Sequence, residues 1–554
     1  GRYEQTLRVW DLSSGRCLRT MSGHKERIIT LSLNRDGRLA LTGSADNSVR
    51  LWDTTTGQCL RTFVDHPSNL CSVAISQDGS TGVSGGWDKT LFRWRLTWDQ
   101  RAPSMICRAT AFDSARAAQE ANQRALRQAK EALTAADPAS AAGHLRVARS
   151  QEGYGREPAS MAAWCALYRH LRRRTLKAAW EIKTLPVPGE EIDALFFSAD
   201  GKRLLSSTRT SKFHLWSLPD GRRLWEYKVK DKEYATGSHL FRDGRQVLIG
   251  TSKNVERCDA DTGTCLRTFA DKKWHFKEHR VSADERRILA GDGKHLSLID
   301  LSNGACLQTF KDTSGSYANS VLSADARLVL RFGYRAADVW DATTGRLLRS
   351  FGDKIEGWRR SAWLSIDGRR ALFGGDYRVL EWWDIATGSC LRPLEGHTGD
   401  VTSVCLTADD RFALSASKDT TVRIWDLATG QCLRTLEGHT HPVKVVCVSQ
   451  DGALAVSAGE DAGIKIWQLD WELEANRPAD WDEAARPYLE TFLTLQTPPK
   501  TFLRRRNRPE WSNERFAVLL DTLACAGFGW LRPEGVRGQL DKMAADWQGP
   551  PPLS

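Results

Sequence analysis

Short runs in which hydrophobic residues alternate with small or polar residues recur along most of the chain, for example in Val401–Leu406 and Phe412–Ala416. A period of two is typical of β-strands that bury one face. Asp-Gly turns such as Asp36-Gly37 and Asp451-Gly452 separate these runs. The pattern therefore predicts short antiparallel strands joined by tight turns.

A longer repeat groups these strands. An aromatic or apolar residue is followed by a turn, usually Thr-Gly or Ser-Gly, and then by a strand similar to Cys-Leu-Arg-Thr. This residue recurs at steps of 42, 42, 122, 42, 41, 41, 43, 42 and 42. The ten positions are Trp10, Trp52, Trp94, Trp216, Cys258, Ile299, Trp340, Trp383, Trp425 and Trp467. The spacing predicts repeated four-stranded units with an insertion of about 80 residues after Trp94.

Four repeats contain a His, a hydroxyl residue, an Asp and a Trp at spacings of 18, 4 and 6 residues. The four sets are His24, Thr42, Asp46 and Trp52; His66, Ser84, Asp88 and Trp94; His397, Ser415, Asp419 and Trp425; and His439, Ser457, Asp461 and Trp467. In its period and in these residues the chain resembles the WD40 β-propeller family.

The resemblance implies a hydrogen-bonded tetrad in each of these blades. Asp holds His, His contacts the hydroxyl, and the hydroxyl contacts the Trp indole. We interpret the sixteen residues as scaffold, and breaking one member is expected to cost about 1–3 kcal/mol. The repeats ending at Trp216, Cys258, Ile299 and Trp340 lack the tetrad, so we expect those blades to depend on packing.

The predicted fold class is all-β, with WD40 propellers and helical additions. We expect a partial propeller of about two and a half blades at 1–102 and a basic helical linker at 103–178. A complete seven-bladed propeller at 179–471 and a helical region at 472–554 follow. The segment Ala179–Leu185 has no blade before it and is expected to pair with the last blade and close the ring. A single ten-bladed ring would leave this segment without a role. The chain begins only a few residues before Trp10, so we expect the first propeller to be truncated.

Composition predicts helices in the insertion and at the end of the chain. In the insertion we expect helices over Ala109–Ala136, then to about Arg149, then to about Arg174. No outer strand is predicted for the blade that ends at Trp94. Near the C-terminus we expect helices around Tyr488–Leu495, from Trp511 through Leu523, and over about Pro533–Trp547.

Cysteine usage favours a reducing, cytoplasmic location. Six of the 13 cysteines occupy one repeat position, and we expect them to be small buried residues that do not form disulfides. They are Cys17, Cys59, Cys265, Cys306, Cys390 and Cys432. No C-x-x-C pair is present, which argues against a zinc site. No apolar stretch long enough to span a membrane is present either.

Two segments match catalytic motifs, but their predicted local structure does not have the geometry that those motifs require. Gly82–Gly86 fits G-x-S-x-G, but no helix follows it, as a nucleophile elbow requires. His275–His279 fits the zinc pattern H-x-x-E-H, but in a strand the two histidines lie about 13 Å apart, too far for one metal. Phosphate-binding and kinase motifs are missing from the sequence. We therefore assign no catalytic, cofactor or metal residues.

Charge is concentrated in the insertion. The chain carries a net charge of +11, and residues 105–178 hold 13 Lys and Arg against 6 Asp and Glu. This excess ends in Arg169–Arg174 and favours a solvated helix face or contact with an acidic propeller surface. The alternative is that this patch binds nucleic acid or an acidic partner. Regular aromatic interleaving is missing, which argues against single-stranded nucleic acid. As candidate partner-binding residues we name Trp87, Lys418 and Glu460, each just before a tetrad Asp, together with Arg172, Arg173 and Arg174.

The predicted function is that of a non-enzymatic scaffold that binds proteins or peptides on propeller faces. The chain also resembles large bacterial WD40-repeat proteins, with Pro478–Asp482 and Gly527–Gly535 similar to their C-terminal region. That resemblance implies an alternative: the sensor or regulatory half of a signalling protein whose Ser/Thr kinase or NTPase domain lies upstream. A propeller hydrolase is a third hypothesis, and no convergent set of carboxylates, His or metal ligands supports it.

Overall fold

The computed structural model describes residues 5–549 apart from a set of short segments. The omitted segments are 12–15, 64–65, 67–68, 78, 88–89, 97–108, 152–153, 188–190, 219, 230–234, 252–253, 271–280, 292–294, 312–316, 335–336, 352–357, 377, 462, 475 and 498–508. The chain forms two compact units. The first comprises residues 1–136 and 140–163, and the second residues 137–139 and 164–554.

The first unit contains three antiparallel sheets in its described part. They are the pair β1 (Thr6–Asp11) and β2 (Arg16–Ser22); β3 (Ile28–Leu33), β4 (Leu39–Ser44), β5 (Val49–Asp53) and β6 (Cys59–Phe63); and β7 (Leu70–Ile75), β8 (Thr81–Gly86), β9 (Leu91–Arg95) and β10 (Ala109–Ala111). One prediction is wrong here, because Ala109–Ala111 is not helical. It pairs with β9 and supplies the outer strand that the sequence did not predict.

Three helices follow these sheets: α1 (Phe112–Thr134), α2 (Pro138–Ser150) and α3 (Pro158–Ala166). Small residues line their contacts, including the buried Ala125 and Ala129 of α1 and Ala148 of α2. Asn122, also buried, donates to the Ala148 carbonyl at 3.2 Å and to the Ser160 hydroxyl at 2.9 Å. One satisfied, buried amide therefore links all three helices.

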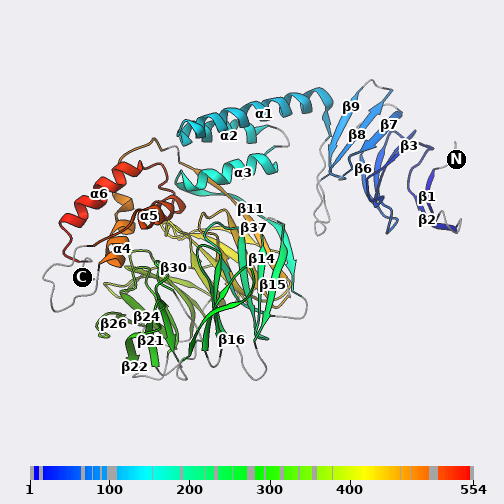
Figure 1. Ribbon diagram of the computed structural model, residues 1–554. Helices are drawn as coiled ribbons and strands as arrows, with labels where there is room; N and C mark the ends of the chain where they lie inside the picture. Colours follow the sequence, from blue (N-terminus) through cyan, green and yellow to red (C-terminus); the bar gives the residue numbers. More distant parts are fainter. Residues whose placement is uncertain are drawn as a thin grey trace. The chain divides into compact units, whose positions relative to one another are not determined.

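The described residues of the second unit form seven sheets, which are arranged as the blades of a propeller (Figure 1). The first sheet contains β12 (Ile192–Phe197), β13 (Arg203–Thr208), β14 (Lys212–Ser217) and β15 (Arg222–Lys228). The second contains β16 (Ala235–Leu240), β17 (Gln246–Thr251), β18 (Asn254–Asp259) and β19 (Cys265–Ala270). The third contains β20 (Arg287–Gly291), β21 (His295–Asp300) and β22 (Cys306–Lys311). The next three are β23 (Tyr317–Leu322), β24 (Leu328–Gly333), β25 (Ala337–Asp341) and β26 (Leu347–Phe351); β27 (Arg359–Leu364), β28 (Arg370–Gly375), β29 (Leu380–Asp384) and β30 (Ser389–Leu394); and β31 (Val401–Leu406), β32 (Phe412–Ser417), β33 (Val422–Asp426) and β34 (Cys432–Leu436).

The seventh sheet joins distant parts of the chain. It consists of β35 (Val443–Val448), β36 (Leu454–Gly459), β37 (Gly463–Leu473) and β11 (Arg173–Pro186). Strand β11 pairs with β37 from Arg173↔Leu473 to Pro186↔Gly463. The first blade's inner strand β12 packs beside β35, so the sheets form a closed circle. The strand begins at Arg173, earlier than predicted, and the third helix of the insertion correspondingly ends at Ala166, followed by a 3-10 turn over Leu167–Arg169.

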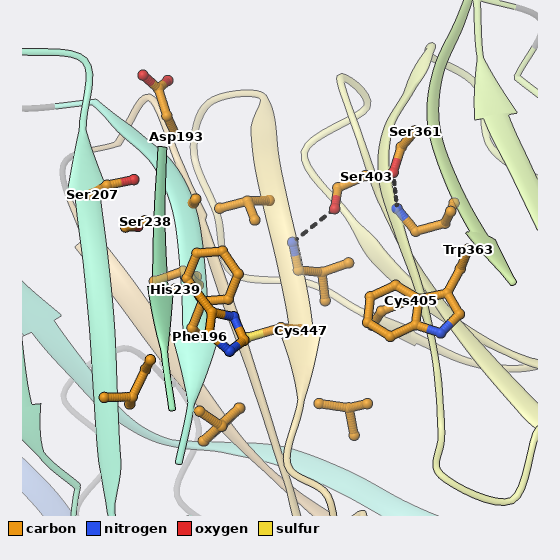
Figure 2. Close-up of a pocket in the computed structure, with 18 of the residues that line it drawn as sticks. Asp193, Phe196, Ser207, Ser238, His239, Ser361, Trp363, Ser403, Cys405 and Cys447 are labelled. Atoms are coloured by element: carbon orange, nitrogen blue, oxygen red, sulfur yellow. Dashed lines mark hydrogen bonds between the residues drawn. The ribbon is translucent and has the colours of Figure 1, made fainter. Parts of the chain in front are cut away.

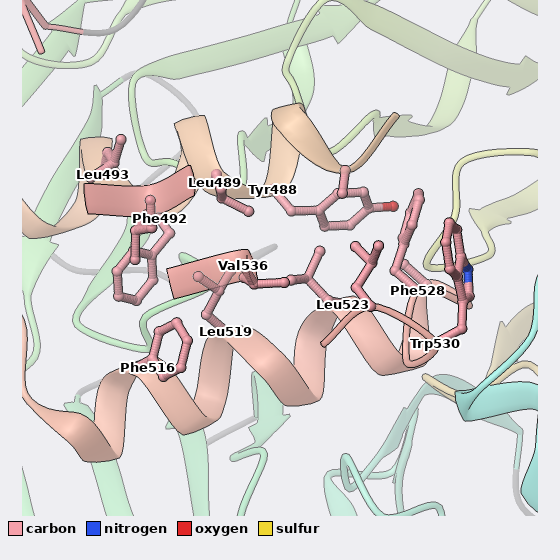
Figure 3. Close-up of a cluster of buried hydrophobic side chains, with 14 residues drawn as sticks. Tyr488, Leu489, Phe492, Leu493, Phe516, Leu519, Leu523, Phe528, Trp530 and Val536 are labelled. Carbon is pink, nitrogen blue, oxygen red and sulfur yellow. The ribbon is translucent and has the colours of Figure 1, made fainter. Parts of the chain in front are cut away.

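Helices from the end of the chain pack on this ring. They are α4 (Arg486–Gln496), α5 (Asn513–Cys525) and α6 (Pro533–Ala545), with a 3-10 turn at Glu483–Ala485. Ser512 caps α5 by accepting a hydrogen bond from the Arg515 amide. Tyr488, Phe492, Leu519 and Leu523 are among the buried residues of their shared core (Figure 3). The apolar face of each short helix is therefore buried against the other two.

Candidate partner-binding surface

Hydrogen-bonded chains connect strands within the tetrad blades. In one of them the His397 Nδ1 atom lies 2.7 Å from Asp419 Oδ2, and its Nε2 atom lies 2.7 Å from the Ser415 hydroxyl. The Trp425 indole donates to the same hydroxyl at 2.8 Å. The sets built on His24 and His439 have the same three contacts, at 2.7–3.0 Å. In the set of His66, the Ser84 hydroxyl lies 2.8 Å from both His66 Nε2 and Trp94 Nε1, and Asp88 is outside the described residues.

Burial and hydrogen bonding set the charges in these chains. Burial lowers the pKa of His397 more than its contact with Asp419 raises it, so the imidazole is neutral at pH 7. Burial alone would raise the pKa of Asp419, but hydrogen bonds from Thr421, His397 and the Thr398 amide lower it to about 2. The same balance lowers the pKa of His24 and of Asp46. In the tetrads of His24 and His397, a neutral imidazole is therefore held by a carboxylate, and both groups are committed to the scaffold.

Two of the blades without a tetrad keep a polar contact that the sequence analysis did not identify. The Trp216 indole donates to the Ser206 hydroxyl at 3.0 Å, ten residues earlier, which is the tetrad spacing of hydroxyl and Trp. In the blade ending at Trp383, the indole donates to Glu381 at 3.1 Å, and the Arg359 guanidinium lies 5.7 Å from the Trp383 ring. The prediction that the blade ending at Trp216 depends on packing alone is therefore wrong.

A central channel, with a volume of about 860 Å³, lies inside the ring. Its walls come from the innermost strands β12, β16, β27, β31 and β35 (Figure 2). Phe196, His239, Trp363, Cys405 and Cys447 lie deep in it. Serines tie neighbouring blades together: the Val404 amide donates to Ser361 at 3.1 Å, and the Val446 amide to Ser403 at 3.4 Å. These bonds hold the walls in a fixed register.

One end of the ring is covered by the C-terminal helices. This end is formed by the turns that follow the innermost strands. Tyr488 of α4 donates to the Ala408 carbonyl at 2.7 Å, and Thr491 donates to the Ile366 carbonyl at 3.1 Å. Arg242 lies 3.3 Å from the Thr522 hydroxyl of α5. Three different blades are therefore bridged by the chain's own helices.

The opposite end presents charged side chains around the channel mouth. Asp193, Arg209 and Arg360 are exposed there, where the innermost strands begin. Lys444 pairs with Glu191 and lies 3.7 Å from Glu460. Although Asp193 is open to the mouth, the surrounding walls raise its pKa by desolvation, against the opposing effect of Lys444 and Arg209. The mouth thus mixes both signs of charge above a largely apolar channel.

The sequence-predicted residues Lys418 and Glu460 belong to this end. Both are exposed and lie in the turns that carry the tetrad carboxylates. Lys418 forms an ion pair with Asp400 at 2.7 Å. Trp87, in the first unit, has 75% of its surface exposed, so it does not pack on a neighbouring strand of that unit. All three side chains are accessible to a partner.

The arginine cluster has a different role. Arg173 is completely buried, pairs with Asp409 at 3.1 Å, and donates to the Cys525 carbonyl at 2.6 Å. The prediction that Arg173 binds a partner is therefore wrong, because no partner reaches it. Arg172 is engaged with Asp482 at 3.1 Å and stacks on Phe528 at 4.5 Å. Arg174 is exposed, and its assignment stays a prediction.

The repeated cysteines are not buried as expected. Cys17, Cys59, Cys265, Cys306 and Cys390 are exposed and Cys432 is partly exposed. A register shift in the third and outermost strands of each blade explains this position. For example, Cys59 lies opposite Trp52 with one extra residue, Leu60, before Arg61 pairs with Leu51. The bulge turns the thiol toward the outer edge of the blade.

The structure describes one of the two rejected catalytic motifs. Gly82–Gly86 lies within β8, an antiparallel strand, and its Ser84 is held by His66 and Trp94. The segment His275–His279 is outside the described residues. No helix in the described part of the chain is both long and apolar enough to cross a membrane.

Comparison with known families agrees with this geometry. Four segments match the WD40 family, the WD domain or G-beta repeat: residues 15–53, 57–95, 388–426 and 430–468. Each segment ends at or just beyond the Trp of one of the four tetrads. A comparison with curated proteins finds no match.

Proposed function

Four segments of the chain match WD40 repeats, and we propose that the protein is a non-enzymatic scaffold that binds protein partners at the open end of its seven-bladed ring. WD40 repeats generally serve as interaction scaffolds, and the proposal adds the face that is used. One observation carries it. The chain's own helices occupy one end of the ring, while the other end keeps exposed charges around the mouth of a channel.

The chemistry of the mouth fits a protein surface. Mixed charges that are already paired with one another, such as Lys418 with Asp400, provide orientation and a fast on-rate more than raw affinity. The channel below, with Phe196 and Trp363 in its walls, has room for one or more side chains of a partner. An anchor that enters an apolar pocket surrounded by a polar rim is a common arrangement at protein interfaces.

Charge reversal at the mouth tests this proposal. The Lys418→Glu variant is compared with Lys228→Glu, which makes the same change at an exposed position on the outer strand β15. Affinity purification from the source cells, with mass spectrometry, is expected to recover partners that the Lys418→Glu variant loses and the Lys228→Glu variant retains. Thermal unfolding of both variants checks that the ring is intact. Identical partner sets for the two folded variants would refute binding at the open end.

A further inference from the structure

The blade made of β16–β19 contains a pair of facing thiols. Cys258 is the second-to-last residue of β18 and lies directly opposite Cys265, which begins β19. The two residues are seven positions apart in the sequence, and the hairpin turn between them brings them together. A bulge at this point places Cys265 and Thr268 on the same face as Cys258 and Glu256.

This pairing follows from a change at the Trp position of the repeat, and a second change lies two residues before it. In other blades the residue opposite the repeated cysteine is Trp or Ile: Trp52 opposite Cys59, Trp425 opposite Cys432, Trp383 opposite Cys390 and Ile299 opposite Cys306. At the position two residues before that Trp, the tetrad blades of Trp52 and Trp425 carry Arg50 and Arg423. Here the corresponding residue is Glu256. One blade has thus replaced an indole and a cation with a thiol and a carboxylate.

The possible ligand atoms of the three side chains lie close together. The two sulfur atoms and a carboxylate oxygen of Glu256 all lie within 4.8 Å of one another. Sulfur ligands about 2.3 Å from a tetrahedral zinc ion are separated by roughly 3.8 Å, which fits within this spacing. The Tyr227 hydroxyl, on the preceding blade, donates to Glu256 Oε2 at 2.8 Å. Such a contact orients a ligating carboxylate from the second coordination sphere.

Access and charge also suit a cation. Cys258 is buried, Glu256 is partly buried and Cys265 is exposed, so the cluster is reached from one side. A divalent cation is attracted to the Glu256 carboxylate and stabilises the thiolate forms of the two cysteines when it binds.

We propose that Cys258, Cys265 and Glu256 form a binding site for a thiophilic divalent cation, with Zn²⁺ as the best match, whose fourth position is open to water. Two thiolates and one carboxylate are borderline-soft ligands that favour zinc over magnesium or calcium. Binding would release the thiol protons and link β18 to β19 in a blade that has no tetrad. This site is independent of the partner surface at the channel mouth.

Metal titration of the reduced, chelator-treated full chain tests the proposal. Zn²⁺ binding is followed by calorimetry, and Co²⁺ is used as a spectroscopic probe of thiolate ligands. We expect one tight site per chain and Co²⁺–thiolate charge-transfer absorption. Cys265→Ser is expected to weaken Zn²⁺ binding at least tenfold and abolish that absorption, and Glu256→Gln to weaken binding less.

The repeat supplies a matched control. Cys306→Ser makes the same change at the equivalent position of the next blade, where the opposite residue is Ile299, and is expected to leave binding unchanged. Circular dichroism confirms that each variant is folded. Equal Zn²⁺ affinity for Cys265→Ser and Cys306→Ser, or Co²⁺ spectra without thiolate bands, would overturn the proposal. Mass spectrometry that finds a Cys258–Cys265 disulfide in place of two thiols capable of binding metal would overturn it as well.

Discussion

At the scale of single residues, a hydroxyl ten positions before the Trp decides how a blade is held. Ser415 accepts the Trp425 indole N–H and also contacts His397, so three buried polar groups are satisfied together. The blade ending at Trp340 has Leu330 at that position. Its buried indole N–H has no partner among the described residues. The contrast between Ser415 and Leu330 shows that the hydroxyl is the group that satisfies the buried indole N–H.

Ser415→Ala is expected to lower the free energy of unfolding by about 1–3 kcal/mol, because it leaves the indole of Trp425 and the Nε2 atom of His397 unpaired in a buried site. Chemical denaturation measures the change. Thr398→Ala removes a hydroxyl from an exposed residue of the same blade and is the control, with an expected effect within about 0.5 kcal/mol. Equal effects of the two substitutions would contradict the role assigned to the tetrad.

The tetrads also predict loss of stability in acid. The unfolded His397 binds a proton near its usual pKa of 6.5, whereas burial lowers the pKa in the folded state. The unfolded state therefore takes up more protons, and stability decreases as the pH falls below about 6.5. Asp419 acts in the same direction at lower pH, because its stabilising effect is lost as pH falls from its usual 3.8 through about 2. Urea unfolding at pH 7 and pH 5 measures the first effect, and His397→Gln should reduce the difference between the two pH values.

At the scale of secondary-structure elements, edge pairing overrides local helix preference at both ends of the insertion. Ala109–Ala111 and the segment from Arg173 belong to sequences that favour helix, yet each pairs with the exposed third strand of a blade. An unpaired strand edge leaves backbone groups without hydrogen bonds, and satisfying them outweighs a few tenths of a kcal/mol of helix propensity per residue. Composition predicted the helices between these ends but not where they stop.

The strand β11 contributes a buried ion pair as well as backbone bonds. The Lys465 side chain is almost completely buried and lies 2.8 Å from Glu181. Glu181→Gln is expected to destabilise the ring by roughly 2–3 kcal/mol, because it leaves a buried ammonium without its carboxylate. Thermal and chemical unfolding measure this change. Glu437→Gln makes the same change at an exposed position and is the matched control, and an equally large effect there would contradict the role assigned to the ion pair.

At the scale of the whole molecule, Arg173 joins three parts of the second unit. It lies in β11, pairs with Asp409 in a turn of another blade, and donates to Cys525 at the end of α5. A buried guanidinium with several acceptors fixes the relative positions of these three parts, because each lost contact leaves a buried polar group without a partner. The basic run at the end of the insertion thus holds the helical cap on the ring.

Arg173→Ala is expected to lower the free energy of unfolding by about 3–5 kcal/mol and to increase hydrogen exchange in α4–α6. The adjacent Arg174→Ala is the control, since Arg174 is exposed, and its effect is expected to stay within about 0.5 kcal/mol. Hydrogen-exchange mass spectrometry locates the change. Unaltered exchange in the three helices of a destabilised Arg173→Ala protein would mean that the cap is held by other contacts.

The sequence by itself determined the repeat, the blade type and the residues of the tetrads, because these depend on local spacing and on hydrogen bonds within one blade. It also identified Ala179–Leu185 as a strand in need of a partner. Only the tertiary structure decided that Arg173 is buried, that the C-terminal helices cover one end of the ring, and that Cys258 faces Cys265 with Glu256 beside them. These features arise where segments distant in the chain, or the two sides of a bulged hairpin, meet in space. The repeat in the sequence does not predict these contacts, because they depend on how the blades close into a ring and pack.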